Sequence, residues 1–325
     1  MVDGPSASEG AETAPGRGPL WVAKPNAHVA RFFHRYTRRL FSKKFHAVRF
    51  TPGSGDLLRA LNDASEPVIV AMNHCSWWDP MVGVLLASGA TPDRRTFAPM
   101  ELAQLEQFAF FRMLGVFGLD PEHPRAVEAM TAYILEQFGS PTSRDREGAV
   151  SPISGEDRSL TVAARSERRS PASLWLTPQG SFADVRTPAK LRPGAAAVAA
   201  AACTRFQHVR VVTLAIEYGF WTDQKPEVFL HAEPVPTPDR ADSTTAWHRA
   251  LTCSLRSSQS ALAERVAARD PAGFELRPDL VGGRVDRERA QVNPIYDLWL
   301  RLRGQSGKVT PRDLASRAPS ERSRG

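Results

Sequence analysis

The sequence predicts an α/β fold, with a central mixed, largely parallel sheet flanked by helices and an N-terminal amphipathic helical segment. Two apolar segments, residues 67–72 and 209–216, are short and rich in β-branched residues, which is typical of buried strands. Segments with helical periodicity lie between and after them, and strands that alternate with helices favour parallel pairing through crossover connections. Hydrophobic residues make up 42% of the 325 positions, which is enough for a sizeable core.

The N-terminal region is predicted to contain a disordered leader over residues 1–24 and a basic amphipathic helix over residues 25–50. The leader is rich in Gly, Pro, Ala and Ser, without the apolar stretch of a signal peptide. From residue 26 to residue 50 there is no Asp or Glu, while aromatic residues recur at helical spacing. Cations beside aromatic rings are typical of a helix on an anionic membrane surface, and the alternative is that the aromatic face packs on the protein's own domain. The basic residues of this segment are Arg31, Arg35, Arg38, Arg39, Lys43, Lys44 and Arg49.

The amino-acid composition indicates which kind of partner the protein binds and in which compartment it works. A net charge of +7 and a pI near 9.7 indicate an anionic partner. We expect a membrane surface and no nucleic acid, because no nucleic-acid-binding motif is present. Three cysteines without metal-ligand spacing argue against a zinc site and a disulfide framework, so we expect no metal and a reducing, cytoplasmic compartment. No stretch approaches the ~20 apolar residues of a membrane-spanning helix, so we expect a peripheral protein on the inner face of the cell membrane.

The remaining elements are expected in one domain over residues 51–304. Within it, residues 139–171 are polar, charged and aperiodic, which predicts a mobile insertion. A short apolar strand at 174–176 resumes the ordered domain, and residues 305–325 are predicted to be a disordered tail. The predicted helices cover residues 81–89, 102–114, 124–138, 194–202, 243–269 and 293–304.

His74 and Asp79 are the candidate catalytic residues. A neutral imidazole can remove the proton of a hydroxyl that attacks a carbonyl, and a carboxylate on its other nitrogen fixes the tautomer and stabilises the cation. Structural explanations remain for both residues. Asp79 before Pro80 is a common helix N-cap, and a histidine at a strand end is often only a satisfied polar group. Cys75 is not expected to be a nucleophile for His74, because neighbours on an extended chain point to opposite faces.

Four sequence blocks in order resemble the lysophospholipid acyltransferase family, whose members include glycerol-3-phosphate and 1-acylglycerol-3-phosphate acyltransferases. The resemblance covers about residues 50–304 and is nearest to a branch that includes chlorobactene lauroyltransferase-like enzymes. The blocks are NHCSWWD at 73–79, LGVFGLD at 114–120 with Arg125, TPQGS at 177–181 followed by RPGA at 192–195, and VVTLAI at 211–216.

The resemblance implies transfer of a fatty acyl group from acyl-CoA or acyl carrier protein to a hydroxyl of a lysophospholipid such as 1-acylglycerol-3-phosphate. It implies that His74 is the general base, that Asp79 orients it, and that no cofactor is needed beyond the thioester. The residues that it implies for substrate binding are Arg125, Gln179, Gly180, Ser181 and Arg192, the glycine and the serine through their main-chain N–H groups.

Two departures from the family pattern keep other functions open. Gln179 stands where the phospholipid enzymes usually have Glu, and Thr213 stands where the fourth block usually has Pro. A glycolipid or a glycosylated carotenoid is therefore an alternative acceptor. A non-catalytic lipid-binding protein on the same scaffold is an alternative of another class.

Overall fold

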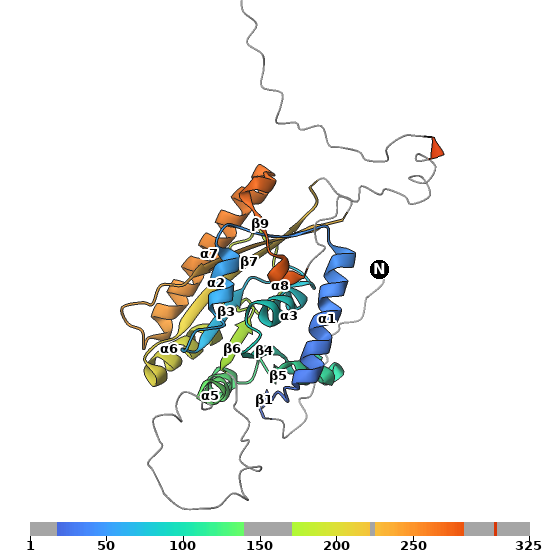
Figure 1. Ribbon diagram of the computed structural model, residues 1–325. Coiled ribbons are helices and arrows are strands. Elements are labelled where there is room, and N and C mark those ends of the chain that lie inside the picture. The colour runs from blue at the N-terminus through green and yellow to red at the C-terminus, as the bar shows by residue number, and fades with distance from the viewer. Residues whose placement is uncertain (1–17, 140–170, 222–224, 283–301, 304–325) are drawn as a thin grey trace, which may run out of the picture.

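The central sheet has the mixed, largely parallel character that the sequence predicts. The computed structural model describes residues 18–139, 171–221, 225–282 and 302–303, and within this part of the chain nine strands form one sheet (Figure 1). Their order is β1-β5-β4-β6-β3-β7-β8-β2-β9. The five strands from β5 to β7 run parallel, while β1 and β8 pair antiparallel with the two ends of this group. The predicted α/β fold is confirmed.

The elements have the following bounds. The strands are β1 (Leu20–Trp21), β2 (Val48–Phe50), β3 (Val68–Met72), β4 (Arg95–Glu101), β5 (Val116–Leu119), β6 (Ala172–Leu176), β7 (Arg210–Gly219), β8 (Glu227–Pro234) and β9 (Glu275–Leu276). The helices are α1 (Ala27–Lys44), α2 (Ser54–Ala60), α3 (Asp79–Ala90), α4 (Leu102–Gln107), α5 (Ala126–Phe138), α6 (Gly194–Phe206), α7 (Thr244–Ala268) and α8 (Pro278–Val281), with 3-10 turns η1 (Ala109–Leu114) and η2 (Pro271–Gly273).

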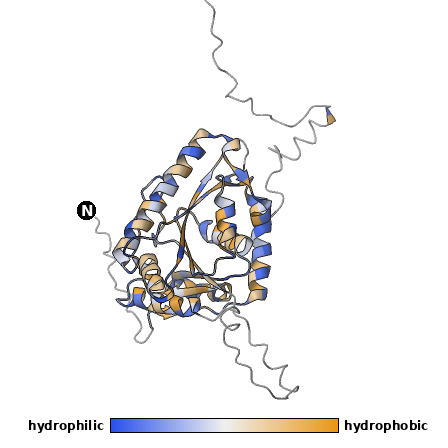
Figure 2. Ribbon diagram, turned by 60° about the vertical axis from the view of Figure 1, so that its left-hand side comes forward, coloured by the Kyte–Doolittle hydropathy of each residue, from blue (hydrophilic) through white to orange (hydrophobic). Residues whose placement is uncertain are grey.

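Helices cover both faces of the sheet, which explains why the central strands are continuously apolar. In β3, Val68, Val70 and Met72 face a core that includes residues of α1, α2, α3 and α8. Ile69 and Ala71 point the opposite way, into a core formed with α5, α6 and α7. Figure 2 shows the strands between these two helix layers. Strands that are buried on both faces lose the polar alternation of half-exposed strands.

Helix α1 is shorter than the predicted segment 25–50. The Asn26 side chain accepts from the N–H groups of the first turn, and the helix ends at Lys44. Residues 48–50 instead form β2, which pairs parallel with β8. Phe41 and Phe45 are buried in the domain core, so part of the aromatic face packs on the protein itself. Among the described residues, no helix is long and apolar enough to cross a bilayer.

The structure also changes several other element boundaries. Residues 20–21, predicted to lie in the disordered leader, form β1 on the edge of the sheet next to β5. The segment 102–114, predicted as one helix, is divided into α4 and η1 at Phe108, whose backbone leaves the helical region. Strands β4 and β8 were not expected from the sequence. The expected leader up to residue 17, the insertion from 140 to 170, the helix from 293 apart from residues 302–303, and the tail lie outside the described residues.

A buried guanidinium ties β6 to the connection between α2 and β3. The Arg94 side chain is 6% exposed, and its two terminal nitrogens donate to four main-chain carbonyl oxygens. These carbonyls belong to Leu61, Ala64, Glu66 and Ala172, at distances of 2.6 to 3.2 Å. Burial lowers the pKa of Arg94 to about 10, so the group stays charged at neutral pH. Arg94 therefore stabilises the sheet at the amino end of the strand that carries His74.

Candidate active site

The chain leaves the sheet at His74 because the preceding residue ends the main-chain pairing. The Asn73 side chain donates through Nδ2 to the Ile216 carbonyl at 3.0 Å, and its Oδ1 accepts from the Ile216 N–H at 2.6 Å. This buried amide takes the place of the next residue of β3 in the ladder with β7. The backbone of His74 is therefore free to turn, and the imidazole lies beyond the carboxyl end of a central parallel strand, where ligands of open α/β sheets bind.

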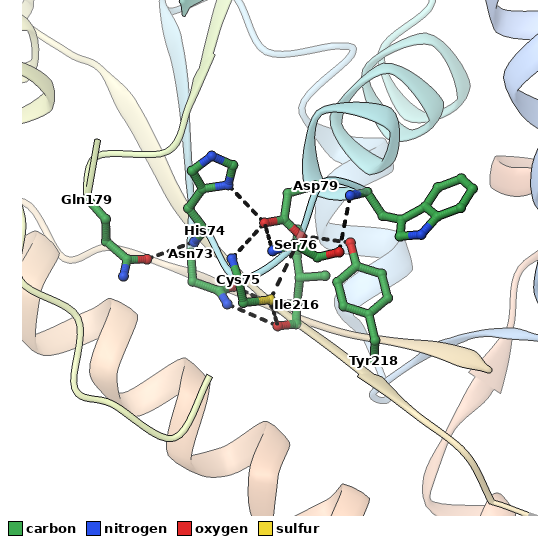
Figure 3. A network of polar contacts seen from close by, with 9 residues as sticks. Asn73, His74, Cys75, Ser76, Asp79, Gln179, Ile216 and Tyr218 are labelled. Atoms are coloured by element: carbon green, nitrogen blue, oxygen red, sulfur yellow. Dashed lines mark hydrogen bonds and ion pairs between the residues drawn. The ribbon is translucent and has the colours of Figure 1, made fainter. Parts of the chain in front are cut away.

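His74 and Asp79 are in direct contact (Figure 3). His74 Nδ1 lies 2.9 Å from Asp79 Oδ2, and the Asp79 side chain is completely buried. Because a carboxylate only accepts, Nδ1 carries the proton, and Nε2 has a free lone pair. Among the described residues, no hydrogen-bond partner reaches Nε2, and the His74 side chain is 16% exposed. The arrangement is a histidine base with its tautomer fixed by a buried acid.

Besides a weak contact from the Cys75 thiol, three other donors hold the Asp79 carboxylate. The main-chain N–H groups of Cys75 and Ser76 donate to Oδ2 at 2.7 and 2.8 Å. The Tyr218 hydroxyl donates to Oδ1 at 2.7 Å, from the end of β7. Asp79 is also the first residue of α3, where the helix dipole favours negative charge. Together these donors replace the water that burial removes from the carboxylate.

Tyr218 was not found from the sequence. It lies 139 residues after Asp79, and no local pattern connects the two. The sequence did contain one signal for Tyr218, which is its position just after the predicted strand 209–216. Parallel strands bring their carboxyl ends to the same edge of a sheet, so a residue that follows one strand can reach a residue that follows another. Burial raises the pKa of Tyr218 well above its usual value, and the Asp79 charge adds to this, so the hydroxyl keeps its proton and remains a donor.

Cys75 lies beside the pair without the properties of a nucleophile. Burial raises the pKa of the Cys75 thiol far above its usual value, and the nearby Asp79 charge raises it further. The thiol is therefore protonated at neutral pH, whereas a reactive cysteine needs its thiolate. Its Sγ is directed to the Ile216 carbonyl at 3.5 Å and to Asp79 Oδ1 at 3.8 Å. This geometry agrees with the expectation that Cys75 does not react.

The loop after β6 wraps the backbone of His74. Gln179 Oε1 accepts from the His74 N–H at 2.7 Å, and the Ala183 N–H donates to the His74 carbonyl at 2.9 Å. Gln179 is nearly buried and its amide oxygen is occupied. The structure therefore places the Gln179 amide oxygen on the His74 main chain, whereas the family resemblance implied a side chain that binds substrate.

Gly180 differs from its expected role for a similar reason. Its N–H donates to the Thr177 carbonyl at 3.1 Å within a turn, so this group does not point at a substrate. Gly180 has φ +69°, and a Cβ there would come within 2.8 Å of the Arg192 side chain. Ser181 is exposed, and among the described residues its N–H has no partner. Of the two N–H groups expected to bind oxygen, only that of Ser181 is available.

The two predicted binding arginines lie in different places. The exposed Arg192 packs over Gly180, and its N–H donates to the Pro178 carbonyl at 2.7 Å, so it borders the loop that holds His74. Arg125 begins α5 after β5, which lies three strands from β3 in the sheet, about 14 Å at the usual strand spacing. Its guanidinium pairs with Glu128 at 3.0 Å on the surface. Among the described residues, no contact joins Arg125 to His74.

Exposed aromatic rings lie next to the imidazole. The Phe182 ring is 4.1 Å from that of His74 between centroids, and Trp77 lies 5.3 Å from Phe182. Trp77 is 79% exposed and Phe182 is 47% exposed. Trp78 turns inward and packs against Phe45 of the chain just after α1, at 4.9 Å. The surface beside the His74 ring is thus lined by exposed aromatic side chains.

Comparison with known proteins does not assign the chain to a family. No protein-family model and no curated protein matches this chain. In the part of the chain that the structure describes, no group of three or more His, Cys, Asp or Glu side chains could hold a metal ion.

Proposed function

We propose that the protein is an O-acyltransferase that moves a fatty acyl group from acyl-CoA or acyl carrier protein to the hydroxyl of a lipid. The observation that carries the proposal is the contact between His74 Nδ1 and the buried Asp79, at 2.9 Å, with Nε2 left free. A structural histidine satisfies its nitrogens within the fold, whereas this one presents a lone pair beside exposed aromatic rings.

The proposed reaction is a direct transfer. The acceptor hydroxyl bonds to Nε2 of His74 and loses its proton to it as the oxygen attacks the thioester carbonyl. Asp79 stabilises the imidazolium that forms. The C–S bond then breaks, and the proton passes from Nε2 to the leaving thiolate. No covalent enzyme intermediate is needed, which agrees with the protonated state of Cys75.

The surroundings of the site favour one acceptor class among those that the sequence leaves open. Gln179 is neutral and bonded to the His74 backbone, and Arg125 is paired with Glu128 three strands away. These two residues therefore offer little charge for a phosphate. A neutral sugar hydroxyl, on a glycolipid or glycosylated carotenoid, fits such a site better than 1-acylglycerol-3-phosphate does. If the acceptor does carry a phosphate, Arg192 is the predicted binding residue that borders the His74 loop.

A transfer assay separates these alternatives. Purified protein is incubated with radiolabelled acyl-CoA and either 1-acylglycerol-3-phosphate or a monoglycosylated lipid, and labelled lipid products are separated. Label in either product supports acyl transfer, and the faster acceptor identifies the class. If lipid binds but no label moves with acyl-CoA or with acyl carrier protein, the non-catalytic alternative replaces this proposal.

We also propose that the protein works on the cytoplasmic side of the cell membrane, with α1 against an anionic surface. Support comes from the charge of α1, which has seven basic residues in or beside it and no acidic one over residues 24–44. Arg31, Arg35, Arg38 and Arg39 are all exposed. A cationic helix of this kind gains about 1 kcal/mol per Lys or Arg near an anionic bilayer.

A further inference from the structure

Exposed aromatic side chains gather where α1 meets the segment formed by α4 and η1. On α1, Phe32 is 68% exposed and Tyr36 is 48% exposed. On the second segment, Phe108, Phe110 and Met113 are 50%, 42% and 37% exposed. We call these four aromatic residues, together with Met113, the aromatic ridge. Large apolar side chains exposed in a group, and not singly, mark an interaction surface.

Ring contacts connect the two halves of the ridge. Phe33 of α1 lies 5.7 Å from Tyr36 and 6.1 Å from Phe110, between ring centroids. Phe111 is 4.2 Å from Phe110 and 6.2 Å from Phe108. The main-chain N–H groups of Lys24 and Asn26, just before α1, donate to the carbonyls of Arg112 and Met113 in η1. The ridge is therefore one continuous surface on two elements that are fixed to each other.

The charge around the ridge identifies the partner. Residues 24–44 and 101–114 contain eight Lys or Arg and two Glu, a net charge of +6, whereas the whole chain has +7. Arg35 and Arg39 lie three residues after Phe32 and Tyr36, so the cations and the rings share one side of the helix. Of the two acidic residues, Glu101 ends β4 and Glu106 lies on α4. Rings beside cations complement a bilayer, which has an apolar interior beneath anionic phosphates.

We propose that the aromatic ridge docks the protein on an anionic phospholipid bilayer, with Phe108 and Phe110 of the second segment entering the acyl boundary together with Phe32 and Tyr36. This extends the α1 contact proposed above to a second element, and it is independent of the acyl-transfer chemistry. Docking through α1 would also hold the site near the bilayer. Phe45, just after α1, packs on Trp78, which precedes Asp79 in the chain and follows exposed Trp77. Figure 1 shows α1 next to α3, whose first residue is Asp79.

Sedimentation with lipid vesicles tests the proposal. The full chain is mixed with vesicles of phosphatidylcholine alone or of equal parts phosphatidylcholine and phosphatidylglycerol. A variant with Phe108→Ser and Phe110→Ser is compared with Phe220→Ser, a phenylalanine outside the ridge that is more exposed than either, at 63%. We expect at least ~10-fold weaker partitioning of the double variant on the anionic vesicles. We expect no loss for the control, and much weaker binding of the native chain to phosphatidylcholine alone.

Either of two sedimentation results would overturn the proposal. One is a double variant that sediments as the native chain does, and the other is equal binding to both kinds of vesicle. Hydrogen exchange of the native chain adds a test that needs no substitution, because residues 102–114 should become protected when anionic vesicles are added, and unchanged exchange there contradicts docking. A dimer in the absence of vesicles that covers the ridge would assign it to a second copy. None of these measurements needs turnover, so failure of docking and failure of acyl transfer are distinguishable.

Discussion

Replacing Tyr218 by Phe tests how the site holds its buried carboxylate. The change removes one hydroxyl, which donates to Asp79 Oδ1 at 2.7 Å, and keeps the ring that packs against Phe45. Among the described residues, Oδ1 then retains only the weak Cys75 thiol contact at 3.8 Å. A hydrogen bond to a charged group contributes about 1.5–3 kcal/mol, so we expect the free energy of unfolding to fall by about this amount. Because a less well-held carboxylate positions the imidazole less firmly, kcat should fall about 10-fold with KM little changed.

The split between kcat and KM separates positioning from simple support of the fold. Turnover is measured by thiol release from acyl-CoA and is divided by the folded fraction, so that a loss of stability alone leaves kcat per folded molecule unchanged. Tyr133→Phe is the control, since the Tyr133 hydroxyl, on α5, accepts from the Ala23 N–H and does not contact Asp79. An unchanged kcat per folded molecule, or a loss carried mainly by KM, would refute this reasoning.

Three further substitutions test other parts of the site and fold. Cys75→Ala should keep kcat within about 3-fold, because the thiol is protonated and does not react, and complete loss of labelled product would instead point to a covalent intermediate. Gln179→Ala should lower kcat and leave KM for the acceptor nearly unchanged, because the amide supports the His74 N–H; a large rise in KM alone would return Gln179 to acceptor binding. Arg94→Lys should reduce the free energy of unfolding by about 2–4 kcal/mol in urea titration, since an ammonium cannot reach four carbonyls, whereas exposed Arg59→Lys should change it by less than about 0.5 kcal/mol. Equal stabilities of these two variants would contradict the role given to Arg94.

The sequence predicted the parts of the fold that depend on local composition. The apolar segments around Val70 and Val212 are strands because both of their faces are buried, and this burial is visible as a run of β-branched residues. The contact between His74 and Asp79 was also predictable, since a strand end and a helix start five residues apart bring the two side chains together. These features need only neighbouring residues.

Other features depend on pairing between distant segments, which a local pattern does not contain. β4 includes charged ends and Pro99, and it is a strand because it lies between β5 and β6. Tyr218 reaches Asp79 only because β7 lies beside β3 in the sheet. Gln179 looks like a substrate ligand in the sequence, and only the folded loop places its amide oxygen on the His74 main chain.

The central claim is that Nε2 of His74 takes the proton of the acceptor hydroxyl, and the turnover of His74→Ala tests it most directly. Turnover with acyl-CoA and the better acceptor should fall at least ~10²-fold, the scale of a lost general base, while vesicle binding and thermal unfolding remain as in the native chain. His208→Ala, an exposed histidine outside the site, should keep native turnover. Native turnover in a folded His74→Ala variant would contradict the account.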